Sequence, residues 1–201
     1  MTREPDARQY FSGLYERSDD PWLLRERWYE RRKRALTLAM LPDERYARAY
    51  EPGCANGELS AALAARCDAL LAADLNPDAV ELARRRVAHL GNVQVEQRAI
   101  PDDWPDGRFD LIVVSELAYY LDEGQLSRLC GRLTESLAPG GTILACHWRQ
   151  PIEGWPHSGD FVHDELNATL PFARLSHYQD DDMELDVWSS NADSVHRREA
   201  K

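Results

Sequence analysis

The chain has 201 residues, of which 43% are hydrophobic, and its formal net charge at pH 7 is −11. This length and hydrophobic content are typical of one compact domain that buries its own core. The acidic balance disfavours nucleic acid as a partner, because binding to a phosphate backbone requires a basic surface that displaces counterions.

Membrane and export signals are not expected in this sequence. Its apolar runs fall short of the roughly 20 residues that span a bilayer, and the opening M-T-R-E-P-D lacks the hydrophobic segment of a signal peptide. We therefore expect a cytoplasmic protein with no membrane partner, and we leave its oligomeric state open. The four cysteines form no C-x-x-C pair, so they are expected to be reduced, structural thiols.

Residues 1–41 are expected to form an N-terminal helical cap within a single domain of residues 1–201. Stretches 6–17 and 23–41 contain no proline and only Gly13 as a glycine, and both carry aromatic residues at helical spacing. This pattern predicts two helices, which we place over the binding site.

The most informative segment is a predicted strand at residues 46–50, the loop E-P-G-C-A-N-G, and a predicted helix at 59–65. Two glycines in the loop allow a tight turn with close approach of the backbone to a ligand. A second buried strand at 69–73 ends in Asp74, whose carboxylate can accept both hydroxyls of a ribose. The residues expected to bind a nucleotide cofactor here are Glu51, Gly53, Cys54, Ala55, Gly57, Asp74, Leu75 and Asn76.

Glu51 distinguishes between cofactors. Two glycines also occur in ordinary strand-to-helix turns, and a dinucleotide site would add a third glycine and free amides for a pyrophosphate. A carboxylate at the head of the loop repels a pyrophosphate but attracts the cationic amino group of a sulfonium amino-acid cofactor. Charge therefore favours S-adenosylmethionine, with S-adenosylhomocysteine as its product, over a nicotinamide dinucleotide.

Further strands and helices alternate beyond Asp74. Asn76 followed by Pro77 begins a helix with a capping side chain and a proline in its first turn. Apolar residues at spacings of three and four predict another helix over 123–137. The remaining predicted strands lie before Arg98, at 109–116 and at 142–147, followed by a hairpin of 172–178 and 183–189. The tail from Asn191 is expected to lack regular structure.

The segment from 46 to 147 resembles the class I S-adenosylmethionine-dependent methyltransferases. Their first motif is an acidic residue followed by Gly at alternate positions, and here Ala55 replaces the middle glycine, which requires an ordinary backbone conformation at that residue. The resemblance implies a Rossmann-like α/β fold: a mostly parallel seven-stranded sheet with helices on both faces and a C-terminal antiparallel hairpin. It implies a cofactor-binding core over 46–147.

A closer resemblance lies outside this core. The segments D-P-W at 20–22, W-Y-E-R-R-K at 28–33, S-E-L-A-Y-Y-L at 115–121, H-W-R at 147–149 and S-G-D-F-V-H-D at 158–164 resemble the NodS family of nodulation-type methyltransferases. Members of that family methylate an amino group on a de-N-acetylated chitooligosaccharide. The resemblance implies an amino sugar or oligosaccharide as the acceptor.

Three further groups are expected to bind the donor. Ala99 and Ile100 follow the third strand and would flank the adenine. The run Arg31-Arg32-Lys33 is typical of a solvated helix face, but one member turned inward would bind the methionyl carboxylate, and arginine does so bidentately. We favour Arg32, we expect Trp28 on the same helix face to bind the donor as well, and we add Ser115 at the end of the fourth strand.

The acceptor side is expected beyond the fourth and fifth strands, because ligands collect at the carboxyl ends of parallel strands. Candidate catalytic residues are Glu116, Tyr119 and His147, and candidate acceptor-binding residues are Tyr120, Trp148, Arg149, Asp160 and His163. The aromatic segment within 148–190 would form the acceptor-site loop ahead of the hairpin. No metal is expected, because methyl transfer needs none and the histidine spacing matches no helical ligand pair.

The sequence therefore predicts an enzyme that transfers a methyl group from S-adenosylmethionine to a small-molecule acceptor, with an amine nitrogen favoured. An amine must be neutral, desolvated and in line with the methyl group, so a strong base is optional. An O-methyltransferase would share every donor contact but would need a base such as His147. A non-catalytic S-adenosylmethionine-binding module is a further alternative, although it leaves the aromatic segment unexplained.

Overall fold

The computed structural model describes residues 6–199. Seven strands form one sheet in the order β3-β2-β1-β4-β5-β7-β6. The strands are β1 (Tyr46–Pro52), β2 (Cys67–Asp74), β3 (Val93–Gln97), β4 (Phe109–Ser115), β5 (Leu137–Trp148), β6 (Ala173–Gln179) and β7 (Met183–Ser189). Strands β1 to β5 pair in parallel, whereas β7 pairs antiparallel with both β5 and β6. The predicted fold class and the terminal hairpin are confirmed.

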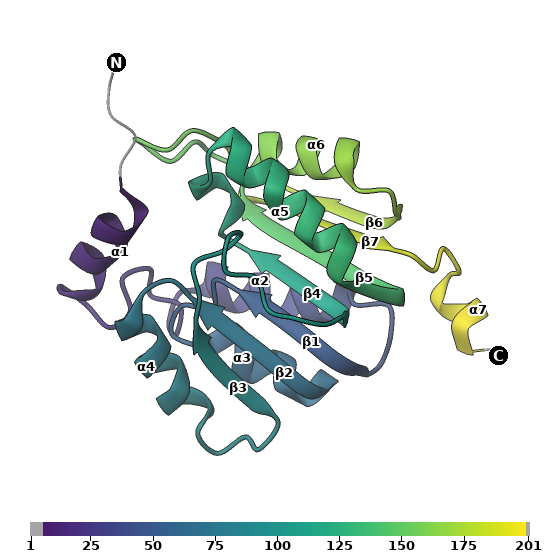
Figure 1. The fold of residues 1–201 in the computed structure, drawn as a ribbon, viewed down its shortest axis with the longest axis horizontal. Helices are drawn as coiled ribbons and strands as arrows, with labels where there is room; N and C mark the ends of the chain where they lie inside the picture. Colours follow the sequence, from purple (N-terminus) through teal and green to yellow (C-terminus); the bar gives the residue numbers. More distant parts are fainter. Residues whose placement is uncertain (1–5, 200–201) are drawn as a thin grey trace.

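Helices cover both faces of this sheet (Figure 1). They are α1 (Ala7–Tyr15), α2 (Trp28–Met40), α3 (Glu58–Leu63), α4 (Pro77–Val87), α5 (Glu123–Ser136), α6 (Gly159–Thr169) and α7 (Val195–Glu199), with 3-10 turns η1 (Ala64–Arg66) and η2 (Ala118–Tyr120). One core cluster joins α5 and α6 to the sheet, and a second joins α2 and α3 to the opposite face. Among residues 6–199, no helix is long and apolar enough to cross a membrane.

Three predicted boundaries differ from the structure. Helix α2 begins at Trp28 rather than near residue 23, because Leu23 has a φ of 56° and the backbone amides of Leu24 and Arg25 bind the Asp20 carboxylate instead. Strand β5 begins at Leu137, which pairs with Phe109 across an irregularity. The tail beyond Asn191 contains α7, where the Arg198 guanidinium binds the Asp43 carboxylate at 2.6 Å.

Candidate active site

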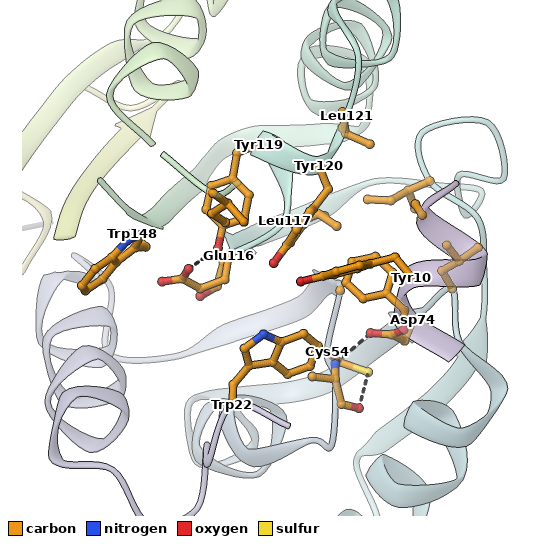
Figure 2. A pocket seen from close by; sticks show the side chains of 18 of the residues that line it. Tyr10, Trp22, Cys54, Asp74, Glu116, Leu117, Tyr119, Tyr120, Leu121 and Trp148 are labelled. Atoms are coloured by element: carbon orange, nitrogen blue, oxygen red, sulfur yellow. Dashed lines mark hydrogen bonds between the residues drawn. The ribbon is translucent and has the colours of Figure 1, made fainter. Parts of the chain in front are cut away.

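A cavity of about 800 Å³ lies where α1 and α2 meet the carboxyl ends of β1, β2 and β4. Figure 2 shows Asp74 and Cys54 at one end and Glu116, Tyr119 and Trp148 at the other, with Tyr120 between them. Most of the predicted donor and acceptor residues line this cavity: Glu51, Gly53, Cys54, Ala55, Asp74, Leu75, Ala99, Ile100, Ser115, Glu116, Tyr119, Tyr120 and Trp148. The position agrees with the rule that ligands bind at strand carboxyl ends.

The glycine loop is shaped by positive φ angles. Gly53 and Gly57 have φ of 75° and 81°, and a Cβ on Gly57 would lie 2.9 Å from the Cα of Ala83 in α4. Gly57 does not line the cavity. Because it has no side chain, it allows α3 and α4 to pack closely against each other. The expectation of an ordinary conformation at Ala55 is wrong, since its φ is 48°; its amide donates to Asp74 Oδ2 at 2.9 Å, which holds the turn.

Two carboxylates line the donor end of the cavity, the half-buried Asp74 and the buried Glu51. Asp74 accepts backbone hydrogen bonds from Ala55 and Asn76 at 2.9 Å each and retains acceptor capacity toward the cavity. Glu51 is only 2% exposed, and its Oε2 is buried without a hydrogen-bond partner among the described residues. Burial, with a smaller contribution from Asp74, raises the pKa of Glu51 to about 8. An ammonium group and ribose hydroxyls fit these two carboxylates, which supports S-adenosylmethionine as the ligand.

Three predicted donor contacts lie elsewhere. The expectation that Arg32 turns inward is wrong: its guanidinium binds Asp180 at 2.7 Å and the Tyr178 hydroxyl on the terminal hairpin. Trp28 is 67% exposed, and Arg31 stacks on its ring. Asn76 caps α4 by accepting from the amides of Asp78 and Ala79, so it stabilises the turn between β2 and α4. None of these three lines the cavity.

Lys33, the third member of the basic run, turns inward instead. Its ammonium lies 2.8 Å from Glu30 Oε2 and 3.1 Å from Glu116 Oε1, and its side chain is 6% exposed. Burial alone would lower the pKa of Lys33, but the two carboxylates outweigh it and the pKa is raised. Sequence analysis missed this ion triad, although a helix of period 3.6 does place residues 30 and 33 on one face.

Glu116 is the hydrogen-bond centre of the acceptor end. Its Oε1 accepts from Lys33 and from the Tyr29 hydroxyl at 3.2 Å, and its Oε2 accepts from the Tyr119 hydroxyl. Its backbone has a φ of 54°, and its amide donates to the Cys146 carbonyl at 2.8 Å. Three donors therefore hold and orient this carboxylate.

Aromatic rings from segments far apart in the sequence form a wall of the cavity. Tyr120 lies 4.7 Å from the Trp155 ring and 5.0 Å from the Phe11 ring, with Tyr10 at 5.1 Å from Trp155. On the other side, Trp148 packs edge-on against Tyr29 at 5.3 Å. Helix α1 and the loop after β5 thus enclose the site together, and the predicted cap contributes rings that sequence analysis did not assign individually.

Four predicted residues in and after strand β5 do not line the cavity. Arg149 pairs bidentately with Asp160 at 2.7 and 3.0 Å. His163 is 1% exposed and bonds to Asp186 at 2.8 Å. His147 is fully buried under the turn that follows β4, where its Nε2 accepts from the Ala118 amide at 3.2 Å. The expected roles of His147 as a base and of Arg149, Asp160 and His163 as acceptor contacts are corrected by this placement.

Known proteins resemble this chain in sequence. A family model described as Nodulation protein S (NodS) matches residues 13–161. Nodulation protein S of Bradyrhizobium diazoefficiens is 34% identical over 143 residues, which are 70% of this chain and 68% of that protein. Nodulation protein S of Rhizobium tropici is 35% identical over 129 residues, which are 63% of this chain but only 54% of the relative.

Solved structures agree with this match. The N-methyltransferase NodS of Bradyrhizobium japonicum WM9, crystallised with S-adenosyl-L-homocysteine, has a TM-score of 0.80 at 26% identity, covering 90% of this chain and 97% of that chain. A Pseudomonas syringae protein assigned as a methyltransferase is 52% identical, with a TM-score of 0.73 over 81% of this chain and 99% of that chain. The chain therefore belongs to the NodS family of class I S-adenosylmethionine-dependent methyltransferases.

Proposed function

We propose that this protein transfers the methyl group of S-adenosylmethionine to an amine nitrogen of an amino sugar or oligosaccharide. The observation that carries the proposal is the Glu116 carboxylate, which is held by three donors and lines the cavity beyond the end of β4. A carboxylate in this state binds a cationic amine better than it deprotonates a hydroxyl.

The donor end of the cavity supports the first half of the proposal. The bound cofactor supplies an electrophilic methyl group on a sulfonium centre. Glu51 would bind its ammonium group, Asp74 its ribose hydroxyls, and Ala99 with Ile100 would enclose its adenine. Arg27 and Arg34 are among the cations that line the cavity, and they are our candidates for its carboxylate in place of Arg32.

The acceptor end supports the second half. Glu116 would hold an amine that enters as an ammonium until it loses its proton to solvent. The free nitrogen would then bond to the methyl carbon in line as the bond from that carbon to the sulfonium sulfur breaks, with S-adenosylhomocysteine as the leaving group. Tyr119 and Tyr29 keep the carboxylate oriented through this step, and the rings of Tyr120, Trp155 and Trp148 exclude water. Positioning and desolvation then supply most of the rate acceleration. Aromatic rings beside a polar centre also suit the apolar faces of a sugar.

An O-methyltransferase is disfavoured by the state of His147. Its Nε2 lone pair is already shared with the Ala118 amide, and burial together with His163 and Lys33 holds its pKa well below the usual value. It does not line the cavity, so it cannot receive the proton of a hydroxyl acceptor there.

The test is methyl transfer from radiolabelled S-adenosylmethionine to a de-N-acetylated chitooligosaccharide, with the fully N-acetylated oligosaccharide as the matched control. We expect label on the free amine only, and turnover that rises with pH until the amine is unprotonated. Label on a hydroxyl, or equal labelling of both oligosaccharides, would overturn the proposal.

Glu116→Gln tests the assigned residue. It preserves the shape of the side chain but removes the negative charge, so we expect turnover to fall by about 10²-fold, within the usual range for a lost positioned group. The dissociation constant of S-adenosylhomocysteine should stay within about twofold, since Glu51 and Asp74 are untouched. Glu165→Gln, on the exposed face of α6, is the control. Equal turnover in Glu116→Gln and the control would remove Glu116 from the acceptor site.

A further inference from the structure

We infer that His147, His163 and Asp186 form a hydrogen-bonded relay with fixed tautomers that positions the turn carrying Glu116 and Tyr119. The inference rests on the proposed function, because Glu116 and Tyr119 are assigned there to the acceptor. The three residues come from β5, α6 and β7, and all are at most 1% exposed. They are positioning residues, since none lines the cavity.

The first end of the relay fixes the tautomer of His147. The Ala118 backbone N–H is always a donor, so the His147 Nε2 that lies 3.2 Å away must carry a lone pair. A neutral imidazole then has its proton on Nδ1, which faces His163 Nε2 at 3.1 Å. His147 therefore donates to His163.

The second end fixes the tautomer of His163 independently. Burial would raise the pKa of Asp186, but hydrogen bonds from His163 and His177 outweigh it and the pKa is lowered, so the carboxylate is ionised. His163 Nδ1, at 2.8 Å from Asp186 Oδ2, must donate to it and leave its Nε2 as an acceptor. Both ends thus require the same direction: Ala118 to His147, His147 to His163, and His163 to Asp186.

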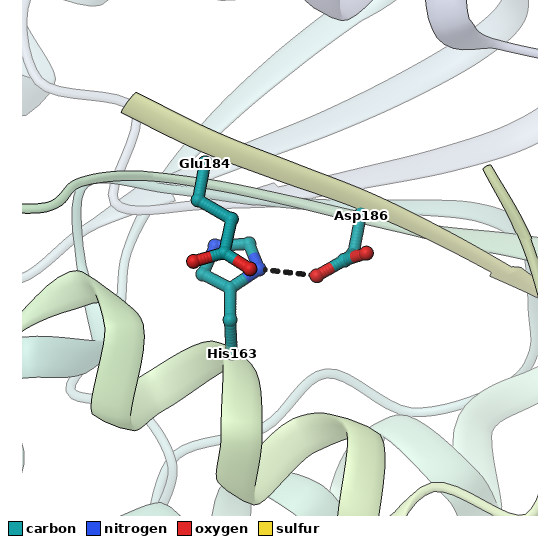
Figure 3. A group of neighbouring side chains, drawn as sticks. All are labelled: His163, Glu184 and Asp186. Atoms are coloured by element: carbon teal, nitrogen blue, oxygen red, sulfur yellow. Dashed lines mark hydrogen bonds and ion pairs between the residues drawn. The ribbon is translucent and has the colours of Figure 1, made fainter. Parts of the chain in front are cut away.

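The direction of these hydrogen bonds also bears on whether His163, Glu184 and Asp186 could bind a metal ion. Figure 3 shows His163, Glu184 and Asp186 together, and their ligand atoms lie within 4.8 Å of one another, a spacing that suits a metal ion. The Nδ1 of His163 donates its N–H in a hydrogen bond to Asp186. In this tautomer Nδ1 has no lone pair for a metal ion. The hydrogen bonds favour a relay over a metal centre.

The relay ends on the turn of the acceptor site. Ala118 begins η2, two residues after Glu116 and one before Tyr119. The Glu116 amide is bonded to the carbonyl of Cys146, and the Tyr119 hydroxyl is bonded to the Glu116 carboxylate. The imidazole below Ala118 therefore fixes the backbone between the two side chains, and the left-handed conformation of Glu116 is held from both sides.

An added proton breaks the relay. Protonated His147 turns an N–H toward the N–H of Ala118, and protonated His163 does the same toward His147. The charged or titratable groups that face the relay are Lys33 from α2, Tyr119 from η2, Asp160 from α6, Glu184 from β7, and Arg174 and His177 from β6. His163 and His177 hold the pKa of Asp186 below its usual value, which maintains the direction of the whole relay.

The direct test uses the native protein and needs no acceptor. Spectra of protein labelled with ¹⁵N-histidine should show His147 and His163 both protonated on Nδ1 and unprotonated on Nε2 at neutral pH. Exchange of the Ala118 amide should be about tenfold or more faster in His147→Leu than in His147→Gln, whose carbonyl can replace the lost acceptor. An Nε2-protonated His147, or equal exchange in the two variants, would overturn the relay.

Kinetics with the de-N-acetylated chitooligosaccharide separate positioning from a purely structural role. His147→Leu should lower kcat about tenfold with the S-adenosylhomocysteine dissociation constant within about twofold, and His147→Gln should restore most of kcat. Leu166→Ala, a buried α6 residue without polar contacts to the relay, should destabilise the fold and leave kcat unchanged. Loss of kcat in Leu166→Ala as large as in His147→Leu would assign the effect to stability alone. The histidine spectra test the relay even if the amine is not the acceptor.

Discussion

Ionisation of Glu51 is unfavourable in the ligand-free donor site, because its carboxyl group is buried and Oε2 has no hydrogen-bond partner among the described residues. The folded protein holds a proton on this group up to a pKa of about 8, whereas the unfolded chain releases it near 4.5. A group with a raised pKa contributes stability below the unfolded value and loses it as pH rises through the folded value. A cationic ligand group offsets the cost of ionisation, because it favours the ionised form.

We therefore expect Glu51→Gln to stabilise the ligand-free protein at pH 8 by on the order of 1–3 kcal/mol relative to native protein, with little gain at pH 4.5. The same variant should bind S-adenosylhomocysteine at least about tenfold more weakly, since the charge that holds the ammonium is gone. Urea unfolding at both pH values and calorimetry measure the two effects, with the exposed Glu44→Gln as control. Unchanged pH dependence in Glu51→Gln would contradict the burial argument.

Lys33 holds two carboxylates together, and its removal exposes their repulsion. Lys33→Met leaves the buried Glu30 without its cation and removes the ammonium that also binds the partly exposed Glu116, so we expect the free energy of unfolding to fall by roughly 3–5 kcal/mol. Arg31→Met, two positions earlier on the exposed face of the same helix, should change it by less than about 0.5 kcal/mol. Denaturant unfolding compares the two, and similar losses would show that Lys33 is not structurally paired.

At the scale of elements, helix α1 and the loop after β5 enclose the cavity together although they lie far apart in the sequence. Tyr10 and Phe11 of α1 contact Trp155 and Tyr120, while the core clusters of the sheet contain no α1 residue among their buried members. Helix α1 therefore contributes to the site more than to the core. The turn after α1 does contact the core of the binding site, because the Asp20 carboxylate accepts a hydrogen bond from Asn56 of the glycine loop at 3.0 Å.

Deletion of residues 1–16 removes α1 and keeps the Asp20 contact. We expect a folded protein whose dissociation constant for S-adenosylhomocysteine rises by about tenfold or more, because the aromatic wall is lost. Deletion of residues 192–201, which removes α7 at the far end of the sheet, is the control and should leave the constant unchanged. Circular dichroism and calorimetry test both; unaltered binding after the first deletion would make α1 a structural element only.

The elements themselves were predictable because their signals are local. The glycine loop, the Asn76-Pro77 helix start and the alternating hairpin each depend on neighbouring residues, and all three appear in the structure. The orientation of single side chains could not be predicted in this way, because it depends on partners that are distant in the sequence. Arg32 faces outward because Asp180 and Tyr178, far along the chain, provide its partners. His147 and Trp148 end the same strand, but adjacent strand residues face opposite sides of a sheet, so His147 points toward α6 and Trp148 toward α2.

At the scale of the whole molecule, the cavity is lined by segments that lie far apart in the sequence. Helices α1 and α2, the loops after β1 and β2, and the turn after β4 each supply part of its lining. Glu51 remains uncompensated until a cation arrives. Ligand binding should therefore stabilise the whole fold, and by more than the filling of an apolar pocket alone would provide.

We expect S-adenosylhomocysteine at about one hundred times its dissociation constant to raise the melting temperature by roughly 5–10 °C, because about 2.7 kcal/mol is gained and each kcal/mol shifts a protein of this size by about 2–4 °C. NADH at the same concentration should produce no shift, since it carries no amino-acid ammonium group to pair with Glu51. Differential scanning fluorimetry measures both. Asp74→Ala should bind more weakly by about 1–3 kcal/mol, so its shift at the same ligand concentration should be smaller. A full shift in Asp74→Ala would remove the ribose contact, and a shift with NADH would show that the carboxylate at the head of the glycine loop does not select the donor.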